Sequence, residues 1–516
     1  MVVAVGLALA WLWSAMPVYW IEDAYIHLAT ARNLVEHGVY GATPHEFTSS
    51  SSSPLWVALL AICMALVGST VQMALALNIV LALAFAAVVA RVLAGTDGWF
   101  AGVAAALAVL MVAPVPLVLS GMEHLGHAAA MVLAVWWLSR RLSDDGAPVN
   151  DVPLLLLLLA LPLLRYESLW LHVLGTALAL VRGERRFALL VAAVGALPVL
   201  AFGLYSQSQG WPFLPAPILA KTVYLADPAT NGAVWLAKYL LWWPLKRLVT
   251  YVPELLAMMI AADYWLAWTL WRDRRSWRHA HWIAVLFFLL GSWAHATFAA
   301  FGWGGRYEAY LLAVGLVALG MALPRTDWRA VAEKKSRERL VGALAAVFLC
   351  LAVLRGWTQH ADLPGRAETV ALRDVWPAQL VRDACGPQPP CPLKVMTMNI
   401  GALSWYAGPR LTDLLALADR EALALLGERR LDGAAVRRLA DIRQIDVALI
   451  FDDFYAEWIG GRPPLIKVAT LVQQTDWPTP LSVYVRDAAD APLMVGFLRH
   501  TPRPARLRIE FEPAFR

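Results

Sequence analysis

The sequence predicts a polytopic α-helical membrane protein with about eleven transmembrane helices and a C-terminal extracytoplasmic α/β domain, and three observations predict this fold class. First, 60% of the 516 residues are hydrophobic and 16% are charged, whereas a soluble domain carries about 25% charged residues. Second, the apolar residues form long continuous runs, which excludes the alternating pattern of an outer-membrane barrel. Third, the basic residues cluster between these runs, as the positive-inside rule requires of cytoplasmic loops. The net charge of +5 therefore indicates membrane topology, and we expect no nucleic-acid partner.

Residues 1–19 are predicted to form a retained first transmembrane helix with its N-terminus in the cytoplasm. The chain has no Lys or Arg before Arg32 and no A-x-A cleavage site in this segment, whereas a secretory signal peptide has both features. Residues 20–54 then form the first external loop. The apolar run 55–68 has 14 residues, against the roughly 20 that a spanning helix needs, so we interpret it as an interfacial helix that closes this loop.

Ten further apolar runs predict the remaining spans, and four basic clusters fix their orientation. The runs lie at about 71–94, 99–119, 124–139, 152–164, 168–181, 187–205, 252–270, 280–300, 309–323 and 339–355. The basic clusters lie within 140–141, 182–186, 272–278 and 325–339. All four fall on the cytoplasmic side only if 55–68 does not cross the membrane. The arrangement predicts a multi-pass protein of the cell inner or plasma membrane, with residues 1–358 as its transmembrane domain.

Residues 359–516 are predicted to form a separate extracytoplasmic domain, because charge rises and long apolar runs stop after about residue 358. Its predicted strands are 394–400, 447–451, 481–487 and 505–512, and its predicted helices are 411–427 and 433–443. Cys385 and Cys391 flank a short Pro-rich loop. An oxidising external location permits a disulfide there, and two free thiols are the alternative.

Glu22 and Asp23 are the first candidate functional residues, because they follow the first predicted span directly. Acidic residues at a membrane edge are costly and often functional. A carboxylate there could accept a proton from an incoming hydroxyl or hold a divalent cation. The alternative is an acidic pair at the start of the next helix, where the helix dipole favours negative charge.

The surrounding motifs resemble those of the GT-C superfamily, which are integral-membrane glycosyltransferases that use polyprenyl-phosphate sugars. The first loop contains W-x-E-D-A-Y-I-H, then A-R-N-L, then T-S-S-S-S-S-P-L-W. The blocks SGMEH (120–124), GWPFLPAPILAK (210–221), GGRYEAYLL (304–312) and NIGALSWYAGPRLTDLLALAD (399–419) follow in the order of the family. The resemblance is closest to the branch with the mycobacterial terminal arabinofuranosyltransferases, and more distant to protein O-mannosyltransferases and aminoarabinose-lipid A transferases. The chain departs from the family at Glu22, Ala216 and Asn399, where Asp, Asn and Asp are usual.

The resemblance implies transfer of a hexosyl or pentosyl group from a polyprenyl-phosphate donor to a hydroxyl of an extracytoplasmic acceptor. Asp23 would be the general base, and a single displacement would invert the anomeric centre. Glu22 would position the acceptor or a metal, so a divalent cation is the only cofactor to consider. The partners implied are the lipid-linked donor, membrane lipid, and a cell-envelope glycan, lipid or protein as acceptor.

Six further residues are candidate substrate contacts, and four of them have a structural alternative. Glu123 would touch the acceptor or the surroundings of Asp23, or serve as a charge at a helix N-terminus. Lys221 would contact the donor phosphate, since excess positive charge outside the membrane needs a reason. Arg306, with Tyr307 beside it, is a second phosphate candidate or an ion pair with Glu308. The remaining two are Arg165, which could instead pair with Glu167, and His124, which with His127 could bind metal but is expected to be satisfied by hydrogen bonds.

Three basic residues are assigned a structural role. Lys238, Lys246 and Arg247 stand among Trp and Tyr residues and indicate an interfacial belt that anchors a helix.

Two other classes of function remain open. A lipid-linked-sugar transporter or flippase would often show inverted repeats, and we find none. A non-catalytic glycan-binding membrane protein is the third class.

Overall fold

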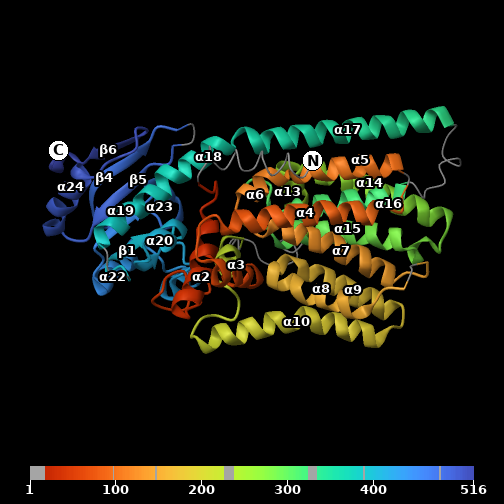
Figure 1. Ribbon diagram of the computed structural model, residues 1–516, viewed down its shortest axis with the longest axis horizontal. Coiled ribbons are helices and arrows are strands. Elements are labelled where there is room, and N and C mark those ends of the chain that lie inside the picture. The colour runs from red at the N-terminus through yellow and green to blue at the C-terminus, as the bar shows by residue number, and fades with distance from the viewer. Residues whose placement is uncertain are drawn as a thin grey trace.

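The structure, a computed structural model, describes residues 18–96, 98–145, 148–225, 238–323, 334–386, 390–475 and 478–516. It is elongated, with a bundle of long helices at one end and a domain built on a β-sheet at the other (Figure 1). Helix α2 (Asp23–His37) and helix α3 (Pro54–Val67) lie where the two parts meet. Most of the predicted first span, residues 1–17, lies outside the described residues.

The bundle consists of helices that follow the predicted apolar runs closely. They are α4 (Met73–Leu93), α5 (Gly98–Val112), α6 (Pro114–Leu119), α7 (His124–Arg141), α8 (Asp151–Leu164), α9 (Leu169–Val181), α10 (Arg185–Ser208), α14 (Pro253–Arg272), α15 (Ala280–Phe298), α16 (Ala309–Ala322) and α17 (Lys334–Ala361). The run 99–119 is divided into α5 and α6 because Ala113 takes a left-handed conformation (φ 49°) directly before Pro114. The interfacial segment predicted at 55–68 is helical as α3, within one residue at each end.

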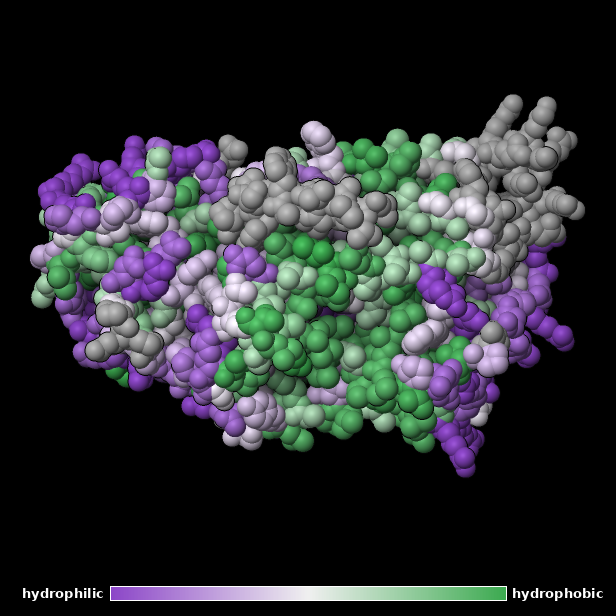
Figure 2. All heavy atoms as spheres, in the orientation of Figure 1, coloured by the Kyte–Doolittle hydropathy of each residue, from purple (hydrophilic) through white to green (hydrophobic). Residues whose placement is uncertain are grey.

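Three helices among the described residues, α4, α10 and α15, are long and apolar enough to cross a membrane by length and composition. Apolar side chains cover the bundle between two polar ends of the molecule (Figure 2). This distribution is the one expected of a protein whose middle lies in lipid. The total of eleven spans and the side on which the N-terminus lies remain predictions.

Three of the basic clusters meet at the end of the bundle that lies away from the sheet. Asp144 accepts hydrogen bonds from both Arg182 and Arg278, and Arg141 is paired with Asp151 and Glu184. The predicted common side of these clusters therefore corresponds to one end of the structure. The side chains of the fourth cluster, 325–339, are not among those described.

The C-terminal region forms a six-stranded sheet in the order β2-β1-β3-β5-β4-β6. The strands are β1 (Lys394–Thr397), β2 (Arg410–Asp413), β3 (Val447–Ile450), β4 (Ile466–Gln473), β5 (Leu481–Val485) and β6 (Leu507–Phe511). β2, β1 and β3 run parallel, whereas the remaining pairs are antiparallel. Helices α18 (Leu363–Val370) and α19 (Trp376–Cys385) lead from α17 into the sheet, and α20 (Gly401–Tyr406), α21 (Arg420–Gly427), α22 (Gly433–Arg443), α23 (Asp452–Trp458) and α24 (Ala491–His500) connect or flank the strands.

One predicted element of this region is wrong. The segment 411–427 was expected to be a single helix, but its first residues form strand β2 and its helix α21 begins only at Arg420. Asp413 ends the strand and accepts hydrogen bonds from the backbone N–H groups of Leu415, Leu417 and Ala418 at 2.8–2.9 Å. These bonds hold the chain in a turn that a continuous helix would not allow.

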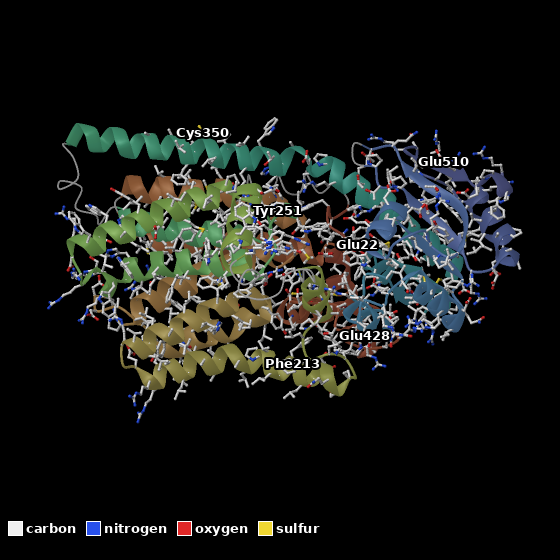
Figure 3. All side chains as sticks on the ribbon, turned by 180° about the vertical axis from the view of Figure 1, so that it is seen from behind. Glu22, Phe213, Tyr251, Cys350, Glu428 and Glu510 are labelled. Carbon is white, nitrogen blue, oxygen red and sulfur yellow. A yellow bond between two sulfur atoms is a disulfide. The ribbon has the colours of Figure 1, made fainter. Side chains whose placement is uncertain are left out.

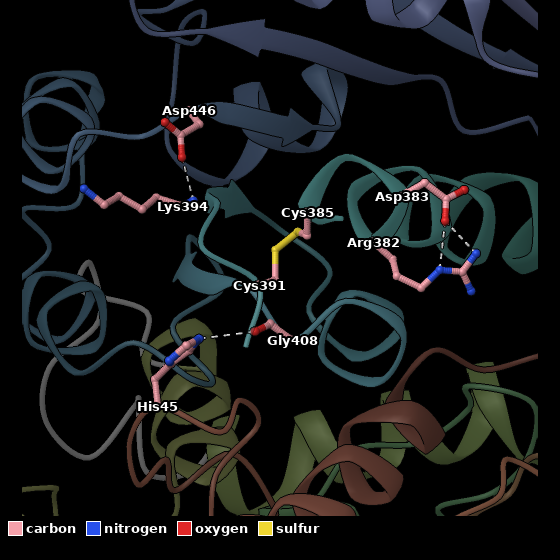
Figure 4. Close-up of a disulfide and its surroundings, with 8 residues drawn as sticks. All are labelled: His45, Arg382, Asp383, Cys385, Cys391, Lys394, Gly408 and Asp446. Atoms are coloured by element: carbon pink, nitrogen blue, oxygen red, sulfur yellow. Dashed lines mark hydrogen bonds and ion pairs between the residues drawn. A yellow bond between two sulfur atoms is a disulfide. The ribbon is translucent and has the colours of Figure 1, made fainter. Parts of the chain in front are cut away.

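Cys385 and Cys391 are joined in a disulfide, which decides between the two predicted alternatives (Figure 4). Cys385 ends α19, and Cys391 precedes β1 by three residues. The disulfide therefore fixes the position at which the chain enters strand β1, whose first residue is Lys394. Lys394 donates its backbone N–H to Asp446 at 2.8 Å, which ties the same point to the approach to β3.

Candidate functional site

Asp23 and Arg306 form an ion pair at the boundary between the bundle and the first loop. The Arg306 Nη2 atom lies 2.7 Å from the Asp23 Oδ2 atom, although 283 residues separate them in the sequence. The Asp23 side chain is 41% exposed and that of Arg306 only 4%. Asp23 is therefore a carboxylate that is held in place by a buried cation and still open to an incoming molecule.

Arg306 keeps unused hydrogen-bonding capacity in this buried position. Its Nη2 atom donates to Asp23 and to the Tyr307 hydroxyl, while its Nε and Nη1 atoms are buried and have no hydrogen-bond partner. A buried donor without a partner is costly, and a charged one especially so. The unpaired N–H groups on these two nitrogen atoms suit an anionic oxygen. The alternative partner considered for Arg306, Glu308, is engaged elsewhere.

A left-handed turn places Arg306 in this position. Residues 302–305 all have positive φ, between 50° and 87°. A Cβ atom at Gly305 would lie 2.5 Å from the Arg355 Nη2 atom, so glycine is required for this close approach. Arg355 in turn pairs with Glu254 and Glu308 and donates to the Gly305 carbonyl oxygen. This buried network, which was not predicted from the sequence, holds the turn that carries Arg306.

Glu22 has a different environment from its neighbour Asp23. Its carboxylate accepts the backbone N–H of Gly401 at the start of α20, and it forms no ion pair with any described residue. A Cβ at position 401 would lie 2.5 Å from the Glu22 carbonyl oxygen. Burial raises the pKa of the Glu22 carboxyl well above its usual range, and nearby Asp374 adds to the rise. Glu22 therefore joins the first loop to the C-terminal domain, as its place in Figure 3 shows.

Arg165 also lies over the Tyr307 ring, and its side-chain donors are fully matched by carboxylates. It donates to Glu123 at 2.6 Å and to both oxygens of Glu167 at 2.6 and 3.2 Å. The Arg165 and Arg306 guanidinium carbons lie 5.4 and 4.8 Å from the centre of the Tyr307 ring. The structural alternative proposed for Arg165, a pair with Glu167, is thus present, and Glu123 at the start of α7 joins it.

The two histidines of α7 differ from expectation. The Nε2 atoms of His124 and His127 are buried and without a hydrogen-bond partner, so the predicted hydrogen-bonded state is wrong for these atoms. The His124 ring contacts Tyr307 edge-on, and the His127 ring lies 4.7 Å from that of Tyr310. Aromatic contacts therefore stabilise both rings. Within the described ranges, no group of three or more His, Cys, Asp or Glu side chains could hold a metal ion.

A large apolar cavity adjoins this cluster of charges. Its volume is about 690 Å³, and it is lined mainly by side chains of α9 and α15 and the segment after α15. Its polar lining residues include Arg165, Glu167, Arg247, Tyr251 and Tyr307; Tyr251 is labelled within the bundle in Figure 3. A cavity with apolar walls and cationic groups suits a lipid with an anionic head.

Arg247 is a residue of this cavity that the sequence interpretation assigned to an interfacial anchor. It follows Lys246 in helix α13 (Trp243–Tyr251) and donates from Nη1 to the carbonyl oxygens of Ala296 and Ala299 at 3.1 and 3.2 Å. No ion pair neutralises it among the residues that the structure describes. Lys221 falls within helix α11 (Ala216–Leu225), but its side chain lies outside the described residues.

Comparisons with known proteins give a likeness in architecture only. No protein-family model and no curated protein matches the chain. Among solved structures, ArnT from Cupriavidus metallidurans bound to undecaprenyl phosphate is 16% identical with a TM-score of 0.47, over 95% of this chain and 99% of that one. The Archaeoglobus fulgidus oligosaccharyltransferase in its apo form is 13% identical with a TM-score of 0.48, over 95% and 72%. At these values neither neighbour assigns this chain to a family.

Proposed function

We propose that the chain is a membrane glycosyltransferase that moves a sugar from a polyprenyl-phosphate donor to a hydroxyl of an extracytoplasmic acceptor. The observation that carries this proposal is the pair formed by the open Asp23 carboxylate and the buried Arg306, whose Nε and Nη1 atoms have no partner. One residue can accept a proton, and the other can hold an anion beside it. The motif resemblance of the first loop gives the reaction class.

In the proposed reaction Asp23 accepts the proton of the acceptor hydroxyl as its oxygen bonds to the anomeric carbon. The bond between that carbon and the phosphate oxygen breaks, and polyprenyl phosphate leaves as an anion. Its charge requires neutralisation rather than a proton, and Arg306 is placed to supply this. A single displacement inverts the anomeric centre.

The apolar cavity is the proposed site of the polyprenyl chain. Its lining by Arg247 and by the Arg165–Glu167 pair places charged groups beside apolar walls. Because Arg165 is neutralised by two carboxylates and Arg247 is not, Arg247 is the better candidate for a second phosphate contact. Lys221 and a divalent cation near Glu22 and Asp23 remain proposals from the sequence.

The test is the variant Asp23→Asn in the full-length chain, supplied with a panel of polyprenyl-phosphate monosaccharides. Loss of a general base lowers the rate by about 10²–10⁴-fold, while polyprenyl-phosphate binding stays within twofold. Asp453→Asn, which removes an exposed carboxylate of α23 outside the apolar cavity, is the matched control and should retain transfer. Sugar transfer at an unchanged rate in Asp23→Asn would refute the role of Asp23 as the general base. Lipid transport that persists in this variant, without glycan product from the unmodified chain, would favour the transporter.

A further inference from the structure

A second cavity lies apart from the Asp23 site, where the first loop meets the edge of the sheet. Its volume is about 670 Å³, and it shares no lining residue with the apolar cavity. Residues of the first loop form one wall, and the starts of β1, β2 and α21 form another. His45 of the loop contacts the Gly408 carbonyl oxygen at 3.3 Å, which joins the two walls (Figure 4).

Two uncompensated cations stand side by side on the sheet wall. Lys394 and Arg410 begin the parallel strands β1 and β2 and are partners in their register. Like charges in opposed positions of neighbouring strands destabilise a sheet. Neither side chain forms an ion pair or a hydrogen bond with any described residue. An anion bound between them would relieve this repulsion.

Most other charged residues that line the cavity are paired or hydrogen-bonded to described residues. Arg443 pairs with Asp419 and Glu421, and Arg420 donates to the Gly210 carbonyl oxygen at 2.8 Å. Glu46 on the loop wall is the one acidic lining residue without a described ion pair. The cavity therefore keeps a net excess of positive charge at Lys394 and Arg410.

Part of the lining of this cavity is aromatic. Phe47 and Trp211 line the cavity with ring centres 6.3 Å apart, and the Phe47 ring contacts Tyr205 edge-on at 5.3 Å. Aromatic faces pack against the apolar C–H faces of sugar rings, while their fixed positions limit the entropy lost on binding. Aromatic rings and unpaired cations in the lining of one cavity are together suited to a saccharide that carries negative charge.

We propose that this cavity binds an acidic saccharide, held by Lys394 and Arg410 through a carboxylate or phosphate group and by Phe47 and Trp211 through its ring faces. The inference rests on the proposed function, since the saccharide would be a part of the acceptor glycan remote from the reacting hydroxyl. A remote contact of this kind raises the selectivity for acidic glycans over neutral ones.

The test is direct binding to the full-length chain in nanodiscs, with tetragalacturonate as the acidic probe and maltotetraose as the neutral one. Tetragalacturonate should bind at least tenfold more tightly, and its affinity should fall as salt is added. Lys394→Gln and Arg410→Gln should each weaken this binding at least fivefold. Arg462→Gln, which removes an exposed cation outside the cavity, should leave it unchanged.

Three outcomes would overturn the inference. They are equal binding of the two saccharides, unchanged affinity in both cavity variants, and displacement of tetragalacturonate by inorganic phosphate at equal concentration, which would indicate a simple ion site. Asp23→Asn separates the inference from the proposed function. It should bind tetragalacturonate normally, and failure of transfer chemistry in the unmodified chain would leave the binding result standing.

Discussion

Arg165 and Arg306 are two buried arginines on the same aromatic ring, yet their surroundings differ. Arg165 meets two carboxylates, those of Glu123 and Glu167, and all its described side-chain hydrogen bonds go to them. Arg306 meets one carboxylate, that of Asp23, and keeps two buried nitrogen atoms without partners. The protein itself uses the side-chain donors of the first arginine, whereas the second keeps buried donors that an anion could occupy. The difference separates a residue that holds the fold from one that can hold a substrate.

The substitution Arg165→Met should lower the stability of the folded protein more than any other change considered below. Its removal leaves Glu123, which is fully buried, without a counter-ion, and such a loss costs about 3–5 kcal/mol. The midpoint of thermal unfolding in detergent should fall clearly. Arg306→Met is the matched control with a smaller fall, because the Asp23 carboxylate that it leaves is 41% exposed. Equal falls in both variants would remove the distinction between the two arginines.

A second substitution should recover part of that loss. Adding Glu123→Gln to Arg165→Met removes the unpaired charge, so the double variant should regain about 0.5–3 kcal/mol relative to the sum of the single changes. The free energies of unfolding of the unmodified chain, the two single variants and the double variant form a double-mutant cycle, which gives the coupling energy between Arg165 and Glu123. Glu254→Gln in the Arg165→Met background is the control, since Glu254 pairs with Arg355 instead. If the effects of Arg165→Met and Glu123→Gln on the free energy of unfolding were strictly additive, the Arg165–Glu123 ion pair would be contradicted.

Arg306→Gln should act on binding more than on folding. Loss of the guanidinium should weaken binding of polyprenyl phosphate about tenfold, which is about 1.4 kcal/mol, with the unfolding midpoint little changed. Lipid titration in nanodiscs gives the affinity. Arg32→Gln serves for comparison, because Arg32 donates to the Ser404 and Trp405 carbonyl oxygens at the domain junction. The idea fails if Arg306→Gln binds the phosphate as well as the unmodified chain.

The smallest effect concerns Glu22, a carboxyl without a described arginine partner. Burial raises its pKa in the folded state, so the folded protein holds this proton more tightly than the unfolded chain. The stability that follows is present at low pH and is lost as pH rises through the folded pKa. Between pH 4 and 8 the unfolding midpoint should therefore fall more steeply in the unmodified chain than in Glu22→Gln. Parallel curves would show that Glu22 does not titrate in this range.

The sequence predicted elements better than it predicted contacts. The boundaries of α22 match those predicted, at 433 and 443, because its apolar residues repeat at helical spacing. Strand β2 was missed because RLTD precedes an apolar stretch that has helical composition, and the turn after it depends on bonds to a single side chain, Asp413. Strand β4 was not predicted either, although IKVATLVQ contains the β-branched residues typical of strands.

Among the site residues, Asp23, Glu22, Arg165 and Arg306 were selected from the sequence, but their partners were not all foreseen. The Asp23–Arg306 pair joins residues far apart in the chain, and a local pattern contains no information on such a pair. Glu308 was the nearest acidic candidate for Arg306, yet it bonds to Arg355. Arg355 was not selected and Arg247 was assigned to an interfacial anchor, because a basic residue beside a long apolar run is the ordinary signal of membrane topology.

The contact between Glu22 and Gly401 also sets an order of events during synthesis. The two residues are separated by 379 positions. Because ribosomes add about 5–20 residues per second, Glu22 is synthesised roughly 20–75 s before Gly401. In the predicted topology, the first loop stands on the far side of the membrane during that time without the domain that completes it. Under the proposed function, a half-made chain can therefore anchor in the bilayer but cannot consume lipid-linked sugar until residue 401 has been translocated and folded.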